Sequence, residues 1–186
     1  MGLEAVRHLL RLAGAFPLAA VDLARERLAS ASASGADLAL CPGDGDAAAA
    51  LRQGNAGRLA DLVIDVTGAP ASFPLATRLA RDLGRVVVLG SPRGPVTIDL
   101  HDHVHTRGLH VIGAHASTTP PRRAPPESPW SMDRDVEVFF ALLRAGRLAV
   151  ADLVTRRLPL TGAGEAHALL DHERTRTMAV LLQLDA

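Results

Sequence analysis

The stretch DLVIDVTGAP (residues 61–70), followed shortly by GRVVVLG (84–90), decides the fold of this chain. Each stretch holds a short apolar run that ends at a glycine, which is typical of a strand buried on both faces of a sheet. The segment between them has apolar residues at helical spacing and predicts a helix over Phe73–Leu83, ended by Gly84. Strand, helix and strand in this order form a βαβ unit with parallel strands, here Leu62–Val66 and Arg85–Leu89.

The same alternation continues on both sides of this unit. Strands are predicted at Leu18–Val21 and Leu38–Leu40 before it and at Leu109–Ile112 after it. The other predicted elements are helices at 3–13, 25–30, 46–53 (capped by Asp44 or Asp46), 136–143 and 163–170 (capped by Thr161), and a last strand at 178–184. This order predicts an α/β fold with a doubly wound parallel sheet.

The composition excludes several kinds of chemistry. The chain has 186 residues, the size of one ordinary domain, and its net charge of zero gives no reason to expect nucleic acid as a partner. All twenty basic residues are Arg and Tyr is absent, so a lysine Schiff base and a Tyr/Lys proton-transfer pair are excluded. The single cysteine, Cys41, excludes a four-cysteine zinc site. No apolar run approaches the roughly 18–20 residues of a membrane span, so we expect a cytoplasmic protein without a membrane partner.

In open α/β sheets, ligands bind beyond the carboxyl ends of the strands. The residues at those ends are Asp22, Thr67-Gly68, Gly90-Ser91 and Gly113. Three of the four positions carry a glycine, which lets a ligand approach the backbone closely. We therefore expect the ligand at this edge of the sheet.

Asp22 matches the acidic residue that ends the second strand of a dinucleotide-binding fold. Such a carboxylate accepts hydrogen bonds from ribose hydroxyls and disfavours the extra phosphate of NADP. In such folds the acidic residue follows a fingerprint glycine by about 20 residues, and Asp22 follows Gly2 by this distance. The full fingerprint G-x-G-x-x-G is absent. Two alternatives stay open: Asp22 could cap the following helix, and a methyltransferase also places an acid here to hold a ribose.

Three histidines, His101, His103 and His105, alternate along the chain. On a strand their imidazoles would share one face, which is an arrangement that can hold a metal ion. We favour an ordinary connector here and predict no metal site in this chain. His115, just past Gly113, is interpreted as a polar loop residue.

The ordered segments resemble the cofactor domain of the medium-chain dehydrogenase/reductase family, which includes zinc-type alcohol, polyol and threonine dehydrogenases. The similarity extends over nearly the whole chain, and members related to bacteriochlorophyllide hydroxyethyl dehydrogenase resemble it most. The segments that carry it are GLEAVRHLLRLAGA (2–15), AAVDLARERL (19–28), ASGAD (33–37), DLVIDVTGAP (61–70), GRVVVLG (84–90), LHVIGAH (109–115), FFALLRAGRLAVADLVTRRLPL (139–160), EAHALL (165–170) and TMAVLLQL (177–184).

By position, the resemblance implies an NAD site, with NADP less favoured. Gly2 and Arg176 would lie by the pyrophosphate, and Asp22 and Arg27 by the adenosine ribose. For both arginines a solvated surface charge is the alternative. The positions expected along the rest of the cofactor are Val66, Thr67, Gly68, Leu89, Gly90, Ser91, His110 and Ile112.

The family's first half, a catalytic domain that supplies the zinc ligands, has no counterpart here, nor has the first strand of a Rossmann sheet. We therefore expect Leu18–Val21 and Leu62–Val66 to lack the strand that normally lies between them. No catalytic residue is expected in this chain, which we interpret as truncated and inactive alone. The expected domains are an incomplete Rossmann domain (1–117), a proline-rich loop (118–131), a closing helix (132–152) and a catalytic-domain segment with exposed apolar surface (153–186).

The sequence thus predicts the cofactor-binding portion of a zinc-type NAD(P)-dependent dehydrogenase that acts on a small secondary alcohol, polyol or carbonyl. The resemblance also implies a homodimer that pairs through Leu109–Ile112. Zinc-free quinone reductases are a variant within the family. The alternatives from other classes are a non-catalytic nucleotide-binding module and a methyltransferase that uses S-adenosylmethionine.

Overall fold

Every strand pair in the described part of the chain is parallel, which confirms the predicted α/β class. The computed structural model describes residues 10–115, 130–173 and 175–184. The chain divides into unit 1 (Met1–Gly45 with Ala141–Ala186) and unit 2 (Asp46–Phe140).

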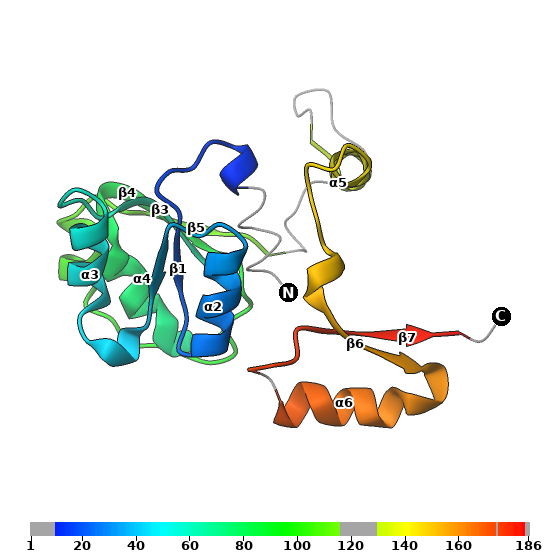
Figure 1. The fold of residues 1–186 in the computed structure, drawn as a ribbon. Coiled ribbons are helices and arrows are strands. Elements are labelled where there is room, and N and C mark those ends of the chain that lie inside the picture. The colour runs from blue at the N-terminus through cyan, green and yellow to red at the C-terminus, as the bar shows by residue number, and fades with distance from the viewer. Residues whose placement is uncertain (1–9, 116–129, 174, 185–186) are drawn as a thin grey trace. The chain divides into compact units, whose positions relative to one another are not determined.

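Unit 1 contains two parallel strand pairs, each with one helix beside it (Figure 1). In the first, α2 (Arg25–Ala33) connects β1 (Ala19–Val21) to β2 (Leu38–Leu40). In the second, α6 (Ala163–His172) connects β6 (Val154–Pro159) to β7 (Ala179–Gln183). Buried Ala20, Leu28 and Ala31 form the apolar core of the first pair.

Unit 2 is a three-stranded parallel sheet with the order β3-β4-β5. Its strands are β3 (Ala60–Asp65), β4 (Ala80–Val88) and β5 (His110–Gly113). Its helices are α3 (Ala47–Gly54), α4 (Phe73–Leu79) and α5 (Met132–Arg144), the last of which continues past the end of this unit. The Asp46 side chain caps α3 by accepting a hydrogen bond from the Ala48 amide, and α4 packs on β3 and β4.

The core of unit 2 lies between α4 and the sheet. Ala76, Ala80, Val86 and Leu109 are buried there, and Val86 has no exposed surface. Full burial of one such side chain stabilises a fold by about 1.5–3 kcal/mol. This core holds the strands whose carboxyl ends carry the candidate site.

The strand orders within the two sheets agree with parts of a Rossmann sheet. Such a sheet has the order 3-2-1-4-5-6, and the pairs β2-β1 and β3-β4-β5 correspond to 3-2 and to 4-5-6. Among the described residues, no strand pairs with the second edge of β1 or of β3.

Three local predictions are wrong. The helix predicted over residues 73–83 ends at Leu79, because Ala80 is extended (φ −73°, ψ 141°) and pairs with Ala60 of β3, and because the Arg107 guanidinium binds the carbonyls of Thr77 and Ala80. The strand predicted over Arg85–Leu89 is β4, which begins five residues earlier, at Ala80. The histidine segment, interpreted as a connector, forms a π-helical turn over His101–His105, in which the ring centroids of His101 and His105 are 6.0 Å apart. Thr161 does not cap α6, whose N-cap is Gly162.

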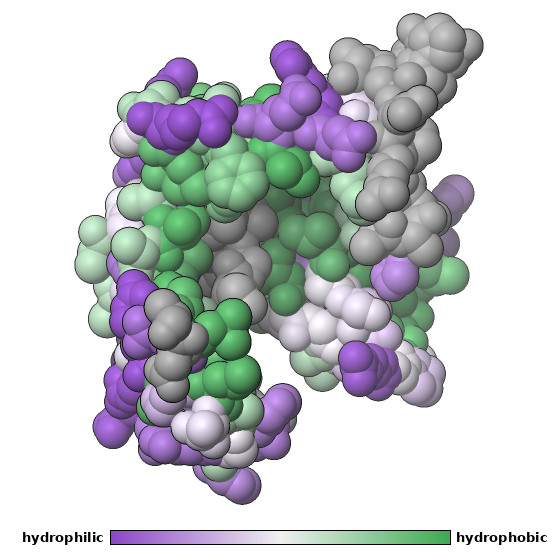
Figure 2. Space-filling view, turned by 90° about the vertical axis from the view of Figure 1, so that its right-hand side faces the viewer, coloured by the Kyte–Doolittle hydropathy of each residue, from purple (hydrophilic) through white to green (hydrophobic). Residues whose placement is uncertain are grey.

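Apolar surface remains exposed (Figure 2), as predicted for residues 153–186. Leu160, Leu170, Leu181 and Leu184 in that segment are 52%, 38%, 39% and 76% exposed. None of the helices in the described residues combines the length and the apolar character needed to cross a bilayer. Most of the predicted proline-rich loop (residues 116–129) lies outside the described residues.

Candidate functional site

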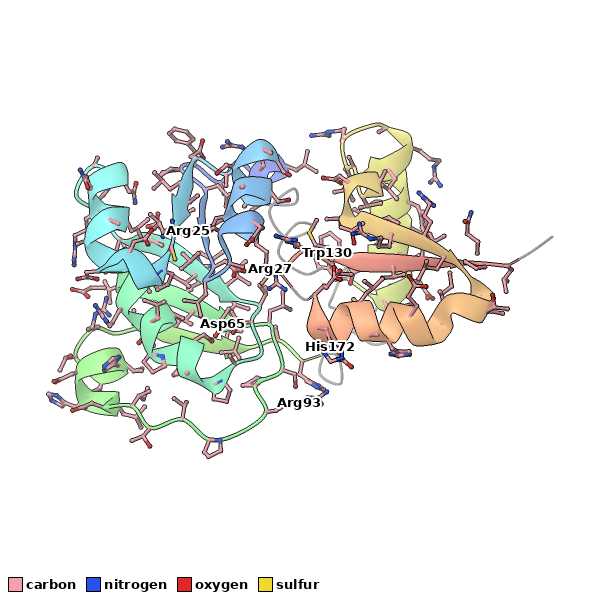
Figure 3. All side chains as sticks on the ribbon, turned by 60° about the horizontal axis from the view of Figure 1, so that its bottom comes forward. Arg25, Arg27, Asp65, Arg93, Trp130 and His172 are labelled. Carbon is pink, nitrogen blue, oxygen red and sulfur yellow. The ribbon has the colours of Figure 1, made fainter. Side chains whose placement is uncertain are left out.

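The carboxyl end of β3 is organised by a carboxylate that sequence reasoning missed. Asp65 is 9% exposed and lies at the last position of the strand (Figure 3). Its Oδ1 accepts hydrogen bonds from the Thr67 amide (3.0 Å) and the Thr67 hydroxyl (2.7 Å), and its Oδ2 accepts one from the Ser72 hydroxyl (2.5 Å). Because a buried carboxylate is costly unless it is hydrogen-bonded, Asp65 fixes the turn that follows the strand.

The backbone of Asp65 joins this turn to the end of the next strand. Its carbonyl accepts hydrogen bonds from the amides of Leu89 (2.9 Å) and Gly90 (2.8 Å). A polar residue that closes an otherwise apolar strand, as in VIDVTG, was the available signal for this role.

Gly68 and Gly90, two of the predicted cofactor positions, lie against each other. A Cβ on Gly90 would stand 2.5 Å from the Gly68 nitrogen and 2.6 Å from the Val66 carbonyl carbon. Gly68 itself has φ +70°, and a Cβ there would be 3.2 Å from the Ser91 oxygen. The structure therefore brings the segments Val66–Gly68 and Leu89–Ser91 together, in a contact that admits no side chain at Gly90.

His110 and Ile112 lie on β5, the outer strand of the same sheet. They pair in register with Arg85 and Val87 of β4, and Gly113 pairs with Val88. The carboxyl end of β5 is therefore level with the end of β4, beside the Leu89–Ser91 segment. Ile112 is 43% exposed, so its side chain is accessible to a ligand.

In unit 1, Asp22 and Arg27 lie close together after β1. Asp22 Oδ1 accepts a hydrogen bond from the Ala24 amide (2.9 Å), and Oδ2 lies 3.8 Å from Arg27 Nη1. The first contact supports the capping alternative in part, although the N-cap position of α2 is occupied by Ala24. The Asp22 side chain is 20% exposed and that of Arg27 is 41% exposed, so both are accessible from solvent.

The other predicted positions are placed as follows. Arg176 is exposed in the turn before β7, where its amide donates a hydrogen bond to the Glu173 carbonyl (3.0 Å). Gly2 lies outside the described residues.

Asp37 connects the start of β1 to the start of β2. Its carboxylate binds the Arg11 guanidinium (3.1 and 2.9 Å) and the Leu18 amide (2.7 Å). The hydrogen bond from Arg11, followed by that from Leu18, holds the pKa of Asp37 below its ordinary value. These contacts hold the start of β1, the strand that Asp22 follows.

Comparison with known proteins identifies the family of the chain. A family model described as zinc-binding dehydrogenase matches residues 2–130. The chain belongs to the zinc-binding dehydrogenase family. It is 29% identical to an L-threonine 3-dehydrogenase of Symbiobacterium thermophilum, over 95% of this chain and 47% of that protein. It is 38% identical to a probable alcohol dehydrogenase of Mycobacterium tuberculosis, over 80% of this chain and 37% of that protein.

Solved structures of zinc-binding dehydrogenase relatives confirm the Rossmann-type fold. The crystal structure of an NAD-dependent alcohol dehydrogenase superposes with a TM-score of 0.76 at 25% identity, covering 98% of this chain and 48% of that one. The chain thus spans less than half the length of the relatives that it matches.

The family description raises the question of a metal ligand set. Structural and catalytic zinc sites need three or four convergent Cys, His or carboxylate side chains. Among residues 10–115, 130–173 and 175–184, no three such side chains are placed to hold an ion. In the histidine turn, His103 Nδ1 lies 2.8 Å from the Thr77 hydroxyl and His101 Nδ1 lies 2.9 Å from Asp102 Oδ1. The described residues therefore do not fit a zinc ion.

Proposed function

We propose that this chain is the cofactor-binding portion of an NAD-dependent dehydrogenase that interconverts a small secondary alcohol or polyol and the matching carbonyl compound. The observation that carries the proposal is the match of residues 2–130 to the zinc-binding dehydrogenase family. The glycine contact at the carboxyl edge of unit 2 and the acidic residue after β1 add the local features that a dinucleotide site needs.

The residues of unit 2 would bind the cofactor mainly through backbone. Amides and carbonyls of Val66–Gly68 and Leu89–Ser91 are held in place by Asp65 and by the contact at Gly90, and His110 and Ile112 continue the same edge. When bound, NAD supplies or accepts the hydride, and the protein orients it. We assign no catalytic residue to this chain.

Asp22 is the proposed determinant of NAD preference. Its carboxylate would accept hydrogen bonds from ribose hydroxyls and repel the additional phosphate of NADP, with Arg27 beside it. Gly2 and Arg176 are proposed for the pyrophosphate. The test is calorimetric titration of the chain with NAD, NADP and S-adenosylmethionine.

We expect NAD to bind, NADP to bind at least about tenfold more weakly, and Asp22→Ala to weaken NAD by about tenfold, as for the loss of hydrogen bonds to a charged group. An exposed carboxylate with no proposed role, Asp171→Ala, serves as the control. Binding of S-adenosylmethionine in preference to NAD would instead support a methyltransferase.

We further propose that catalysis needs residues that this sequence does not contain. The proposed division of the chain is the Rossmann-like domain (1–117), the proline-rich loop (118–131), the closing helix (132–152) and the catalytic-domain segment (153–186). The purified chain is then expected to bind NAD without oxidising alcohols. Turnover of NAD with an alcohol, with or without added zinc, would contradict this part of the proposal. The same proposal keeps the cytoplasm as the location and a small alcohol or carbonyl compound as the substrate.

A homodimer that pairs through β5 is the proposed assembly. β5 is an outer strand, and its Val111 and Ile112 are 44% and 43% exposed. Exposed strand edges with apolar side chains favour pairing between chains. Sedimentation of the wild type and of Val111→Glu tests this: we expect a dimer that the substitution dissociates, and a monomeric wild type would disprove it.

A further inference from the structure

Unit 2 holds an arginine-lined cavity of about 450 Å³ at the edge of the sheet opposite the candidate cofactor site. Leu59, which precedes β3, and Arg81 and Asp82, near the start of β4, mark this amino edge. The lining residues are Asp46, Ala48, Arg52, Gly57, Arg58, Leu59, Arg78, Arg81, Asp82 and Arg107. Five of the ten side chains are guanidinium groups, and such a concentration of like charge needs compensation.

Three of the arginines already bind carboxylates. Arg78 donates a hydrogen bond to Asp46 (3.0 Å), and Arg81 binds Asp61, which lies outside the lining. Arg107 Nε donates to Asp82 (2.9 Å), and its two terminal nitrogens bind the carbonyls of Thr77 and Ala80. Arg107 is 20% exposed and therefore forms a fixed wall of the cavity.

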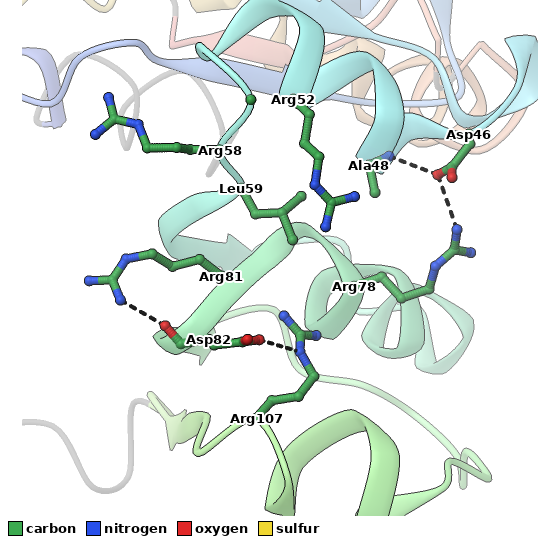
Figure 4. A pocket seen from close by; sticks show the side chains of 10 residues that line it. Asp46, Ala48, Arg52, Arg58, Leu59, Arg78, Arg81, Asp82 and Arg107 are labelled. Atoms are coloured by element: carbon green, nitrogen blue, oxygen red, sulfur yellow. Dashed lines mark hydrogen bonds and ion pairs between the residues drawn. The ribbon is translucent and has the colours of Figure 1, made fainter.

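In the described part of the chain, Arg52 and Arg58 make no hydrogen bond or ion pair with a carboxylate, although the charge of Arg58, after that of Arg81, contributes to the lowered pKa of Asp61. Among the interactions of the described residues, neither guanidinium makes a hydrogen bond or an ion pair, and Figure 4 draws no contact to either. Arg52 extends from α3 toward Leu59 and Arg107, whereas Arg58 points in the opposite direction, away from Arg52 (Figure 4). Five guanidinium groups thus face three carboxylates, Asp46, Asp61 and Asp82, which leaves two positive charges unbalanced.

We propose that this cavity binds a small multiply charged anion that carries adjacent phosphate groups. A planar guanidinium donates two parallel hydrogen bonds to phosphate oxygens, and each of these arginines has donors that its protein contacts do not use. The cavity volume of about 450 Å³ has the size of a small-molecule site. The Arg52 side chain is the principal ligand, because no carboxylate competes for it.

An extended polyanion fits the cavity less well than a small one. Asp82, in the lining, and Asp61, the partner of Arg81, are 76% and 83% exposed, so a nucleic-acid backbone bound by these arginines would also meet both carboxylates. Repulsion of like charges at these positions selects for a compact ligand that enters between the arginines. A small phosphorylated metabolite has this chemistry.

The site is separate from the proposed cofactor site. The six residues of β3 span about 16 Å at 3.3 Å per residue, and the two sites lie at opposite ends of that strand. A ligand in the cavity therefore does not occupy the Val66–Gly68 edge, and the inference goes beyond the proposed function.

The experiment is a titration of the full chain with inorganic pyrophosphate in phosphate-free buffer, followed by calorimetry and by backbone amide NMR shifts. We expect binding that weakens with added salt and shifts that cluster in residues 51–59 and 80–82. Arg52→Gln is expected to weaken binding by about tenfold or more, the usual effect of losing a charge-assisted pair. Arg144→Gln, which removes an exposed arginine from α5, is the matched control and is expected to change affinity by less than about twofold.

Several results would overturn the proposal. These are the absence of pyrophosphate binding, equal affinity in Arg52→Gln and the wild type, and shifts confined to residues 66–68 and 89–91. Tighter binding of a single-stranded oligonucleotide than of pyrophosphate would show a nucleic-acid surface instead. Thermal unfolding of Arg52→Gln checks that the variant is folded, and because Arg52 is exposed we expect an unchanged midpoint.

Discussion

The two edges of the sheet β3-β4-β5 present opposite chemistries on the same three strands. At the carboxyl edge, backbone amides and glycines form the surface, and Asp65 holds them from within. At the amino edge, long arginine side chains line a cavity, and carboxylates balance part of their positive charge. A site made of backbone groups depends on close packing, so an added side-chain atom disrupts it. A site made of exposed side chains tolerates substitution, so its charges can be removed one at a time.

The largest effect is expected for Gly90→Ala. The added Cβ would overlap backbone atoms of Val66, Thr67 and Gly68, which cannot move without breaking the Asp65 contacts. We expect a loss of about 2–4 kcal/mol in the free energy of unfolding, as for overpacked cores, and loss of NAD binding. Denaturant unfolding and NAD calorimetry measure the two effects.

Gly164→Ala is the matched control for that substitution. No atom lies within 4 Å of a Cβ at Gly164, which is in α6. Alanine favours a helix over glycine by about 0.5–1 kcal/mol, so this variant is expected to gain stability. If both glycine variants unfold at the same denaturant concentration, the close contact at Gly90 does not exist.

A smaller effect is expected for Asp65→Asn. The amide keeps the shape but replaces a carboxylate oxygen by a donor, so donors of Thr67 or Ser72 would face an amide NH2 where they now meet an acceptor. Loss of such a buried contact costs about 1–3 kcal/mol. Asp99→Asn is the control, because Asp99 also accepts backbone amides but is exposed. Equal losses in unfolding free energy for the two variants would mean that burial of Asp65 is unimportant.

Elements whose ends are marked by local chemistry could be predicted from the sequence. The strand 38–40 matches β2, and the predictions at 18–21, 62–66, 109–112 and 178–184 differ from the observed strands by one or two residues at one or both ends. Asp46 caps α3 as one of the two predicted candidates. Apolar runs bounded by glycine, proline or aspartate carry this information in a few neighbouring residues.

Features that depend on distant partners could not be predicted. The end of α4 is set by Arg107, which lies 30 residues from Thr77 and binds its carbonyl, and no local pattern reveals that contact. The cavity likewise combines arginines from α3, α4, β4 and the segment before β5. At the carboxyl edge, the glycines were found from their place after strands, but the role of Asp65 needed the positions of Thr67 and Ser72.

Arg107→Met tests whether the amino edge contains a structural arginine as well as ligand-binding ones. Methionine keeps much of the length of the stem but loses the contacts to Asp82, Thr77 and Ala80, two of them at the end of α4. We expect a loss of about 1.5–3 kcal/mol in unfolding free energy, since hydrogen bonds to a charged group are removed. Arg52→Met, at an exposed position, is expected to stay within about 0.5 kcal/mol. Equal unfolding free energies of Arg107→Met and Arg52→Met would mean that Arg107 has no structural role.

The smallest effect concerns the electrostatics of the amino edge. The hydrogen bond from Arg81 holds the pKa of Asp61 below its ordinary value of 3.8. A carboxyl group whose pKa is lowered by folding adds stability above its unfolded pKa and loses it as the pH falls through the folded pKa. Because Asp61 is 83% exposed, the change in unfolding free energy is expected to be small, and carboxyl NMR titration is the suitable measurement.

That titration separates the two edges by their response to salt. In Arg81→Gln, or at high ionic strength, the pKa of Asp61 should rise toward its ordinary value, because the interaction is between exposed charges and salt screens it. The NMR shift of the Gly90 amide should not respond to salt, because its partner is the backbone carbonyl of Asp65. A pKa of Asp61 that is unaffected by both changes would mean that Arg81 does not hold this carboxylate in solution. The balance of charge around the cavity would then leave more than two arginines available to an anion.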